Sequence, residues 1–362
     1  MDLKKQNILF ITRAPIQGGT ENVILQLCEI LYNNVNKIVV CAGVGFNKKR
    51  LEELGIKFYD IPDIERKTPV ILFQVCKIIQ NIIDTEDITV IHTHHRMAAF
   101  YVSLLKLYKK CVFINTSHNT FYNKKFLTQF SYKHGYLIAC GEMVKKNLIQ
   151  EFGLSDKQVT VIHNAVKPFD GNIIVDTLVK KFHNEGNFVI GNIGRLSKQK
   201  GMEFFIYAIP EVIKKQSNTR FIIVGNGEDE EKLKKLSKNL GLNDYLYFLG
   251  YRNDIQNLMS QLDLIVLSSL WEGLPLIPIE AFSVKKTIVA TDVDGTPEIV
   301  KNMDNGLLVE PGNSKEIANA ILWMIENKDM KNKMELNAKK TFDDQFSEIT
   351  FSNSIINYYR SI

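Results

Sequence analysis

The chain has 362 residues, 45% hydrophobic and 23% charged, a composition typical of a globular protein and a length sufficient for two domains. Its longest apolar runs are about nine residues, too short to cross a bilayer, and its five cysteines form no CxxC pair. We therefore exclude membrane spans and a disulfide or zinc framework, and we expect a cytoplasmic protein without a secretory signal.

The net charge of +5 is unevenly distributed along the chain. Residues 1–168 carry +8 and the remainder −3, and nine basic residues against one acid fall between positions 91 and 146, interleaved with aromatic residues. Lysines near an anionic bilayer contribute about 1 kcal/mol each. A simply solvated basic face is the alternative, and no nucleic-acid motif is present. The predicted membrane or acceptor patch consists of Lys106, Lys109, Lys110, Lys124 and Lys125.

Short apolar runs rich in valine and isoleucine alternate with helical patterns in the first half, as in parallel sheets buried on both faces. The predicted strands are 8–12, 37–41, 88–92, 112–116, 136–139 and 159–162, and the predicted helices are 20–32, 69–83 and 97–107. The loop after the first strand contains Gly18 and Gly19, which allow a ligand to approach the backbone closely. An ordinary glycine turn is the alternative interpretation.

The segment 166–186 contains a proline and a glycine and has no strong strand pattern, so we place a domain junction there. Beyond it the predicted strands are 188–193, 220–224, 245–249, 264–268, 287–290 and 307–309, and the predicted helices are 202–214, 229–240, 279–284, 314–326 and 339–362. Such alternation predicts right-handed βαβ units and an α/β fold with two doubly wound parallel sheets. The two domains are predicted at 1–168 and 185–344.

One loop of the second half, Gly194 to Gly201, carries cationic side chains suited to a diphosphate. It follows the first strand of that half and opens a helix, and it places Arg195 five residues before Lys200. A guanidinium binds a diphosphate with two hydrogen bonds and an ammonium binds it as a point charge. Such a pair would offset the charge on a departing nucleoside diphosphate without a metal. A solvated basic loop is the alternative.

Glu272 and Glu280 bracket the run Gly-Leu-Pro-Leu-Ile-Pro-Ile after a predicted buried strand. Both prolines fit the first turn of a helix, where backbone N–H groups lack partners inside the helix. The pattern predicts a tight turn and a helix start that offers N–H donors to an anionic ligand, with carboxylates beside it for sugar hydroxyls. The alternative is a helix with one N-terminal and one exposed glutamate.

Histidines gather at the ends of two predicted strands. His92, His94 and His95 end one strand, and His118 follows the next. Metal binding is disfavoured, because no acid lies near in the sequence and alternate strand residues point to opposite faces. We expect His92 and His94 to be packing residues and His118 to have a polar role in an active site.

Together these residues resemble the retaining glycosyltransferase family 4, whose GT-B fold has two Rossmann-like domains facing a central cleft. The resemblance covers nearly the whole chain. It implies an acceptor-binding first domain, a donor-binding second domain, and a C-terminal helix at about 345–362 that crosses back to the first domain. The motifs that carry it are Gly18-Gly19-Thr20-Glu21, the His118 loop, Asn164, Gly194-Arg195 to Lys200-Gly201, Gly225-Asn226-Gly227, Leu249-Gly250-Tyr251 and Glu272-Gly273-Leu274-Pro275 to Glu280.

The resemblance also implies catalytic roles. Arg195 and Lys200 would hold the donor diphosphate, and Glu272 would lie at the donor sugar. His118 would contact that sugar near the reacting carbon. The donor would be a nucleotide sugar, with UDP as the family-level expectation, and neither a metal nor a dinucleotide cofactor is expected.

The remaining implied residues bind the donor. Glu280 would bind the ribose hydroxyls, and the main chain near Tyr251 and Arg252 would read the base. Gly18 and Gly19 would close on the diphosphate from the other domain. The full set of donor-binding residues is Gly18, Gly19, Asn164, Gly227, Tyr251, Arg252, Gly273, Leu274 and Glu280.

Within the family, the first domain looks most like bacterial enzymes of exopolysaccharide or capsule synthesis, whose acceptors are lipid-diphosphate-linked or other saccharides at the inner face of the membrane. The expected reaction retains the anomeric configuration by front-face attack, with the leaving phosphate helping to take the acceptor proton. A nucleotide-sugar epimerase of the same architecture and a non-catalytic protein that binds anionic lipid or polymer are the alternatives. A dinucleotide-dependent oxidoreductase would need a phosphate fingerprint that the sequence lacks.

Overall fold

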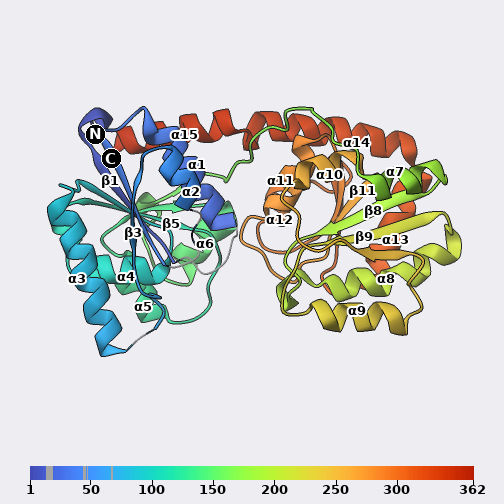
Figure 1. Ribbon diagram of the computed structural model, residues 1–362, viewed down its shortest axis with the longest axis horizontal. Coiled ribbons are helices and arrows are strands. Elements are labelled where there is room, and N and C mark those ends of the chain that lie inside the picture. The colour runs from blue at the N-terminus through green and yellow to red at the C-terminus, as the bar shows by residue number, and fades with distance from the viewer. Residues whose placement is uncertain (14–18, 44–45, 47, 67) are drawn as a thin grey trace. The chain divides into compact units, whose positions relative to one another are not determined.

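The structure is a computed structural model of the chain and describes residues 1–13, 19–43, 46, 48–66 and 68–362. It divides into two compact units. Unit 1 comprises Met1–Asn164 and Phe351–Ile362, and unit 2 comprises Ala165–Thr350. Each unit is a parallel sheet with helices on its faces (Figure 1).

The described part of unit 1 contains a seven-stranded parallel sheet in the order β3-β2-β1-β4-β5-β6-β7. The order reverses direction between β1 and β4, as in doubly wound folds. Strand β3 was not predicted, because none of its residues is fully buried and it contributes no apolar run. The strands are β1 (Asn7–Ile11), β2 (Lys37–Ala42), β3 (Lys57–Asp60), β4 (Val90–Thr93), β5 (Val112–Ser117), β6 (Tyr136–Ala139) and β7 (Val159–Val161).

The helices of unit 1 connect these strands. In the longest of them, α3, Thr68 accepts a hydrogen bond from the Ile71 amide and Pro69 occupies the first turn, the pattern expected at a helix start. The helices are α1 (Gly19–Tyr32), α2 (Lys48–Glu53), α3 (Pro69–Thr85), α4 (Arg96–Leu104), α5 (Lys125–Tyr132) and α6 (Glu142–Gln150).

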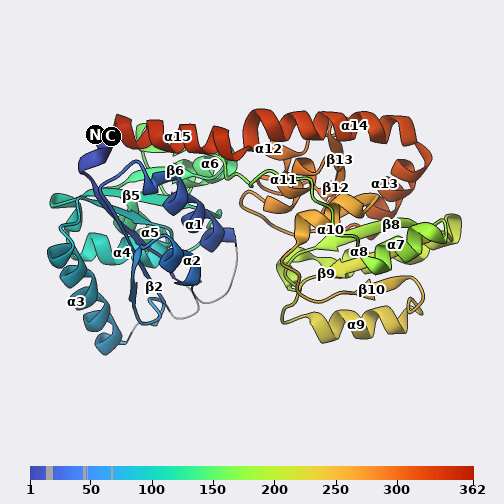
Figure 2. The same ribbon diagram turned by 45° about the horizontal axis from the view of Figure 1, so that its top comes forward.

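The C-terminal helix α15 (Glu348–Ser361) returns to unit 1, which confirms the predicted crossing. The Met1 amino group donates hydrogen bonds to the Arg360 carbonyl at 2.6 Å and to the Ile362 main-chain carboxylate at 2.9 Å, so the two chain ends lie side by side (Figures 1 and 2). The buried Tyr359 hydroxyl lies 2.7 Å from His92 Nδ1, which ties the helix to β4.

Unit 2 contains, within the described residues, a six-stranded parallel sheet in the order β10-β9-β8-β11-β12-β13. Here the order reverses between β8 and β11. The strands are β8 (Phe188–Ile193), β9 (Thr219–Val224), β10 (Leu246–Phe248), β11 (Leu264–Leu267), β12 (Ile288–Thr291) and β13 (Gly306–Val309). The helices are α7 (Thr177–Asn184), α8 (Met202–Lys215), α9 (Glu230–Asn239), α10 (Ile255–Gln261), α11 (Leu276–Ser283), α12 (Thr296–Ile299), α13 (Ser314–Glu326) and α14 (Lys328–Thr341).

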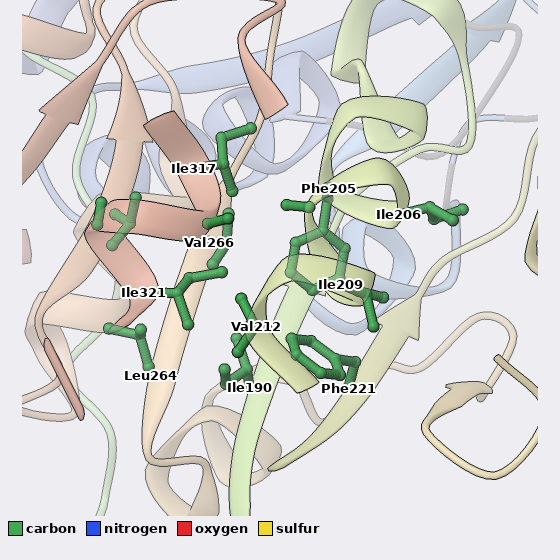
Figure 3. Close-up of a cluster of buried hydrophobic side chains, with 14 of the residues drawn as sticks. Ile190, Phe205, Ile206, Ile209, Val212, Phe221, Leu264, Val266, Ile317 and Ile321 are labelled. Atoms are coloured by element: carbon green, nitrogen blue, oxygen red, sulfur yellow. The ribbon is translucent and has the colours of Figure 1, made fainter. Parts of the chain in front are cut away.

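One apolar core of unit 2 lies between its sheet and the helices α8 and α13. Figure 3 shows Phe205 and Ile209 of α8, Ile321 of α13 and Ile190 of β8 within one cluster. These side chains are fully buried, so this layer holds β8 and its neighbours in place. The loops that follow the strands are therefore carried by a rigid frame.

Residues 165–176, which cover the first part of the predicted junction 166–186, are bound to α10. The Asn257 side chain exchanges two hydrogen bonds with the Ile174 backbone at 2.8 and 2.9 Å, and Gln261 Oε1 accepts one from the Asp176 amide at 2.8 Å. Because side-chain amides satisfy its backbone, this segment belongs to unit 2 without being a strand or helix.

Candidate functional site

The second sheet places six loops at one edge. All its strands are parallel, so the loops after β8, β9, β10, β11, β12 and β13 lie at their carboxyl ends. Ligands of open α/β sheets bind at this edge, beside the point where the strand order reverses. That point is the β8–β11 pair, which positions the Gly194–Gly201 loop next to the loop that carries Glu272.

Two hydrogen bonds join the ends of β8 and β11. The Asn192 side chain donates to Ser268 Oγ at 2.9 Å, and the Ser268 hydroxyl donates to the Lys200 carbonyl at 3.0 Å. Asn192 and Ser268 are buried, so this contact is shielded from water. It determines where Lys200 lies relative to β11.

Lys200 and Glu272 form an ion pair at this position. Lys200 Nζ lies 2.5 Å from Glu272 Oε1, and the Ser269 hydroxyl donates to the same oxygen at 2.6 Å. The side chains of Lys200 and Glu272 are 18% and 7% exposed. Glu272 Oε2 makes no hydrogen bond to the described residues, so one carboxylate oxygen remains available to a ligand.

Glu280 lies on α11 and is half-buried. Burial raises its pKa to about 7, and the nearby positive charge of Lys200 acts in the opposite direction. Glu280 therefore lies within electrostatic range of Lys200. Arg195, the fourth predicted group, is exposed, and its guanidinium has no ion pair or hydrogen bond within the part of the chain that the structure describes.

The turn before α11 matches the predicted helix start. Pro275 precedes the first helical residue and Pro278 is the third, so neither interrupts the helix. The amides of Gly273 and Leu274 donate no hydrogen bond to any described residue. They are free N–H donors beside Glu272, as an anion site at such a turn requires.

The predicted Gly225-Asn226-Gly227 loop packs backbone to backbone against the Lys200 loop. Gly225 has φ of 134°, and a Cβ atom there would lie 1.9 Å from the Gly194 carbonyl oxygen. A Cβ atom at Gly227 would lie 2.3 Å from the carbonyl oxygen of Leu196. Both glycines are required by this close approach, which shapes the loop around Lys200.

Tyr251 and Arg252 follow β10 on the same edge. Tyr251 is 59% exposed. The Arg252 guanidinium is bound by Asp254 at 2.5 and 2.7 Å and by Asp176 at 2.7 Å, which lowers the pKa of Asp254 to about 2. The Arg252 side chain is therefore held in place by the two aspartates, which is compatible with the predicted main-chain contact to the base.

Two further residues of this site, Asp294 and Ser269, were not predicted from the sequence. The Glu272 amide donates to Asp294 Oδ2 at 2.8 Å, across 22 residues of sequence. The signal that could have found it is the Asp294-Gly295 pair in the loop that follows the predicted strand 287–290. Ser269 lies one residue beyond the predicted strand 264–268, and no motif distinguishes it in the sequence.

In unit 1, His118 follows β5, also at the carboxyl edge of its sheet. Its Nε2 lies 3.0 Å from His94 Nδ1, and burial lowers its pKa to about 4. His92 is fully buried, with both ring nitrogens hydrogen-bonded to Tyr359 and Thr116, as expected of a packing residue. No group of three or more histidine, cysteine or acidic side chains arranged to hold a metal is found over the described ranges.

Of the other predicted residues of unit 1, the structure describes Asn164 and Gly19. Asn164 is buried at the last position before unit 2, and Gly19 begins α1. Gly18 lies outside the described residues.

The five predicted patch lysines are all exposed, but they do not form one patch. Lys106, Lys109 and Lys110 precede β5, whereas Lys124 and Lys125 follow it. A six-residue strand is about 20 Å long, so the two groups lie at opposite edges of the sheet. The single patch is corrected to two. No helix in the ranges described combines the length and apolar character needed to cross a bilayer.

Two family models match the chain. The model "Glycosyltransferase Family 4" matches residues 17–168, and the model "Glycosyl transferases group 1" matches residues 176–341. A relative from Escherichia coli, UDP-Gal:alpha-D-GlcNAc-diphosphoundecaprenol alpha-1,3-galactosyltransferase, is 26% identical over 98% of this chain and 97% of its own.

Solved structures share the fold over the whole chain. A glycosyltransferase from Rickettsia africae superimposes with a TM-score of 0.86 and 22% identity, covering 99% of this chain and 98% of its own. Alr3699/HepE from Anabaena, solved in complex with UDP, has a TM-score of 0.84 and 22% identity over 99% of this chain and 100% of its own. The predicted GT-B fold is confirmed.

Proposed function

Because the chain carries a glycosyltransferase family 4 domain and a group 1 domain, we propose that the protein is a glycosyltransferase that moves a sugar from a nucleotide sugar to an acceptor hydroxyl. UDP is the proposed nucleotide, since the Anabaena structure holds UDP and the Escherichia coli relative is named for UDP-Gal. A lipid-diphosphate-linked or other saccharide is the proposed acceptor, and bacterial exopolysaccharide or capsule synthesis is the proposed setting.

The observation that carries the proposal is the Lys200–Glu272 pair at the strand-order reversal of unit 2. Lys200 has three N–H donors, and Glu272 takes one of them, which leaves two for phosphate oxygens. The free amides of Gly273 and Leu274 and the open oxygen of Glu272 lie in the adjacent turn. This set supplies donors for a diphosphate and an acceptor for a sugar hydroxyl.

The chemistry follows from where charge develops. As the bond between the anomeric carbon and the diphosphate breaks, negative charge grows on the leaving phosphate, and Lys200 with the exposed Arg195 would stabilise it. The acceptor hydroxyl would attack from the same face, so that its proton passes to the leaving phosphate and the configuration is retained. Because these side chains would supply the positive charge, we propose that the reaction needs no metal ion.

The remaining donor contacts are proposed from the site residues. Glu280 would bind the ribose hydroxyls, and the main chain at Tyr251 and Arg252 would contact the base. His118 and Asn164 of unit 1 remain predicted donor contacts. With a pKa of about 4, His118 would act as a neutral hydrogen-bonding group at neutral pH.

Peripheral membrane contact is proposed for the carboxyl edge of the first sheet. Tyr122 and Phe126 are 72% and 86% exposed there and flank Lys124 and Lys125. Aromatic side chains among lysines suit the interface of an anionic bilayer. Charge reversal of Lys124 and Lys125 should reduce flotation with phosphatidylserine vesicles more than reversal of Lys109 and Lys110, and equal losses would contradict this assignment.

The function is tested by binding and then by turnover. A screen of nucleotide sugars by thermal shift should show stabilisation of about 2.7 kcal/mol when the ligand is at a hundred times its Kd. The stabilising donor should then be converted with saccharide or lipid-linked acceptors, and NMR of the product should show retained configuration with EDTA present. Conversion of the donor to an isomeric nucleotide sugar without any acceptor would instead establish an epimerase.

A further inference from the structure

The loop after β12 is in backbone contact with the loop that carries Glu272. Asp294 Oδ2 accepts the Glu272 N–H at 2.8 Å. At the next position, a Cβ atom on Gly295 would lie 2.0 Å from the Gly273 carbonyl oxygen. A side chain at 295 would therefore push the two loops apart, and the contact depends on glycine there.

Asp294 adopts an unfavourable backbone conformation to make this contact. Its φ of 40° lies in the left-handed region, which non-glycine residues rarely occupy, although aspartate and asparagine tolerate it best. Gly295 has φ of −80°, which any residue can adopt. The strain thus falls on the residue whose carboxylate reaches Glu272, and such strain in a sheet-edge loop points to a functional constraint.

The contact holds Glu272 from a third direction. Its carboxylate is bound through Oε1 by Ser269 and Lys200, and its amide is bound by Asp294. The next two amides, of Gly273 and Leu274, remain without hydrogen bonds to the described residues. Asp294 therefore occupies the first donor of the turn and leaves the following two to a ligand.

We infer that Asp294 is a positioning residue of the donor site, which holds the Glu272 main chain so that its carboxylate and the Gly273 and Leu274 amides reach the donor in one arrangement. This inference rests on the proposed function, because the nucleotide sugar is the ligand served. Fixing such groups before reaction avoids reorganisation when charge develops. Loss of Asp294 should lower turnover while Lys200 and Arg195 still bind the diphosphate.

The test compares D294G, D294A and D294N with D292G. Gly relieves the φ strain and removes the acceptor, Ala removes the acceptor alone, and Asn keeps both an acceptor oxygen and tolerance of the left-handed region. Asp292 lies in the same loop, is exposed, and its carboxylate has no hydrogen bond to the described residues, so D292G is the matched control. We expect kcat to fall about tenfold in D294G and D294A and less than about threefold in D294N and D292G.

Two further readouts separate positioning from stability. The Kd for UDP should stay within about threefold in every variant, and hydrogen exchange of the Glu272 amide should accelerate in D294G and D294A only. Unchanged kcat and unchanged amide protection in D294G would overturn the inference. A kcat loss that disappears when D294G is assayed well below its unfolding temperature would also overturn it, because such a loss would come from unfolding. Wild-type protein that neither binds UDP nor transfers a sugar would overturn the proposed function itself, whatever the exchange rates.

Discussion

Replacing Lys200 by methionine removes the ammonium group at the centre of the proposed site and keeps most of the side-chain length. The Lys200 and Glu272 side chains are 18% and 7% exposed, so the substitution leaves a buried carboxylate without its cation. Breaking a buried pair costs about 3–5 kcal/mol. Because Lys200 is partly exposed and Ser269 still donates to Glu272, we expect a loss of about 2–3 kcal/mol in the free energy of unfolding.

The same substitution should reduce catalysis more than stability alone explains. Removing one preorganised group that stabilises developing charge costs about 3–4 kcal/mol, which lowers turnover by about 10²–10³-fold. Turnover is measured with the donor found by thermal shift, at a temperature where K200M is fully folded by circular dichroism. K198M is the control, since Lys198 lies in the same turn, is exposed, and has no ion pair among the described residues.

A double-mutant cycle tests the pairing itself. E272Q alone leaves Lys200 without its counter-charge, whereas K200M with E272Q removes both charges, so the double variant should be more stable than the sum of the single losses predicts. The expected coupling is at least about 1 kcal/mol. Additive losses, or turnover of folded K200M within about threefold of wild type, would refute the reasoning.

Three other predictions concern single side chains. Glu280 keeps its proton up to about pH 7 in the folded protein but releases it near pH 4.5 in the unfolded chain, so the free energy of unfolding of wild type should decrease between these pH values by at most about 3 kcal/mol relative to E280Q. Calorimetry should also show that UDP binds wild type more tightly above pH 7, where Glu280 is ionised. Hydrogen bonds from Lys57, Tyr59 and Lys37 lower the pKa of buried Glu86 to about 2. In urea unfolding at pH 7, E86Q should therefore be about 2 kcal/mol less stable than wild type, and this difference should disappear as the pH falls from 4.5 to 2. Y359F, which removes the hydroxyl bound to His92, should lower stability by about 1–2 kcal/mol, whereas Y358F should not, because the buried Tyr358 hydroxyl has no partner among the described residues; equal losses would contradict the assignment.

Local patterns determined most of the framework. The predicted strands 188–193 and 136–139 and the helix 314–326 have the same bounds in the structure, because continuous apolar runs and helical periodicity report directly on burial. The loops that carry Arg195, Lys200 and Glu272 could be placed at strand ends for the same reason. Where burial is weak the prediction failed, as at β3 and at α5, whose Phe126 is exposed.

Only the tertiary structure decided which of these groups meet. It separated the lysines that flank β5, bound the Arg252 side chain to Asp176, and placed Asp294 against the Glu272 amide. Each of these results depends on strand order and on contacts between residues far apart in the chain. Periodicity in a sequence encodes which face of an element is buried, whereas the pairing of loops follows from the sheet that forms when those faces pack together.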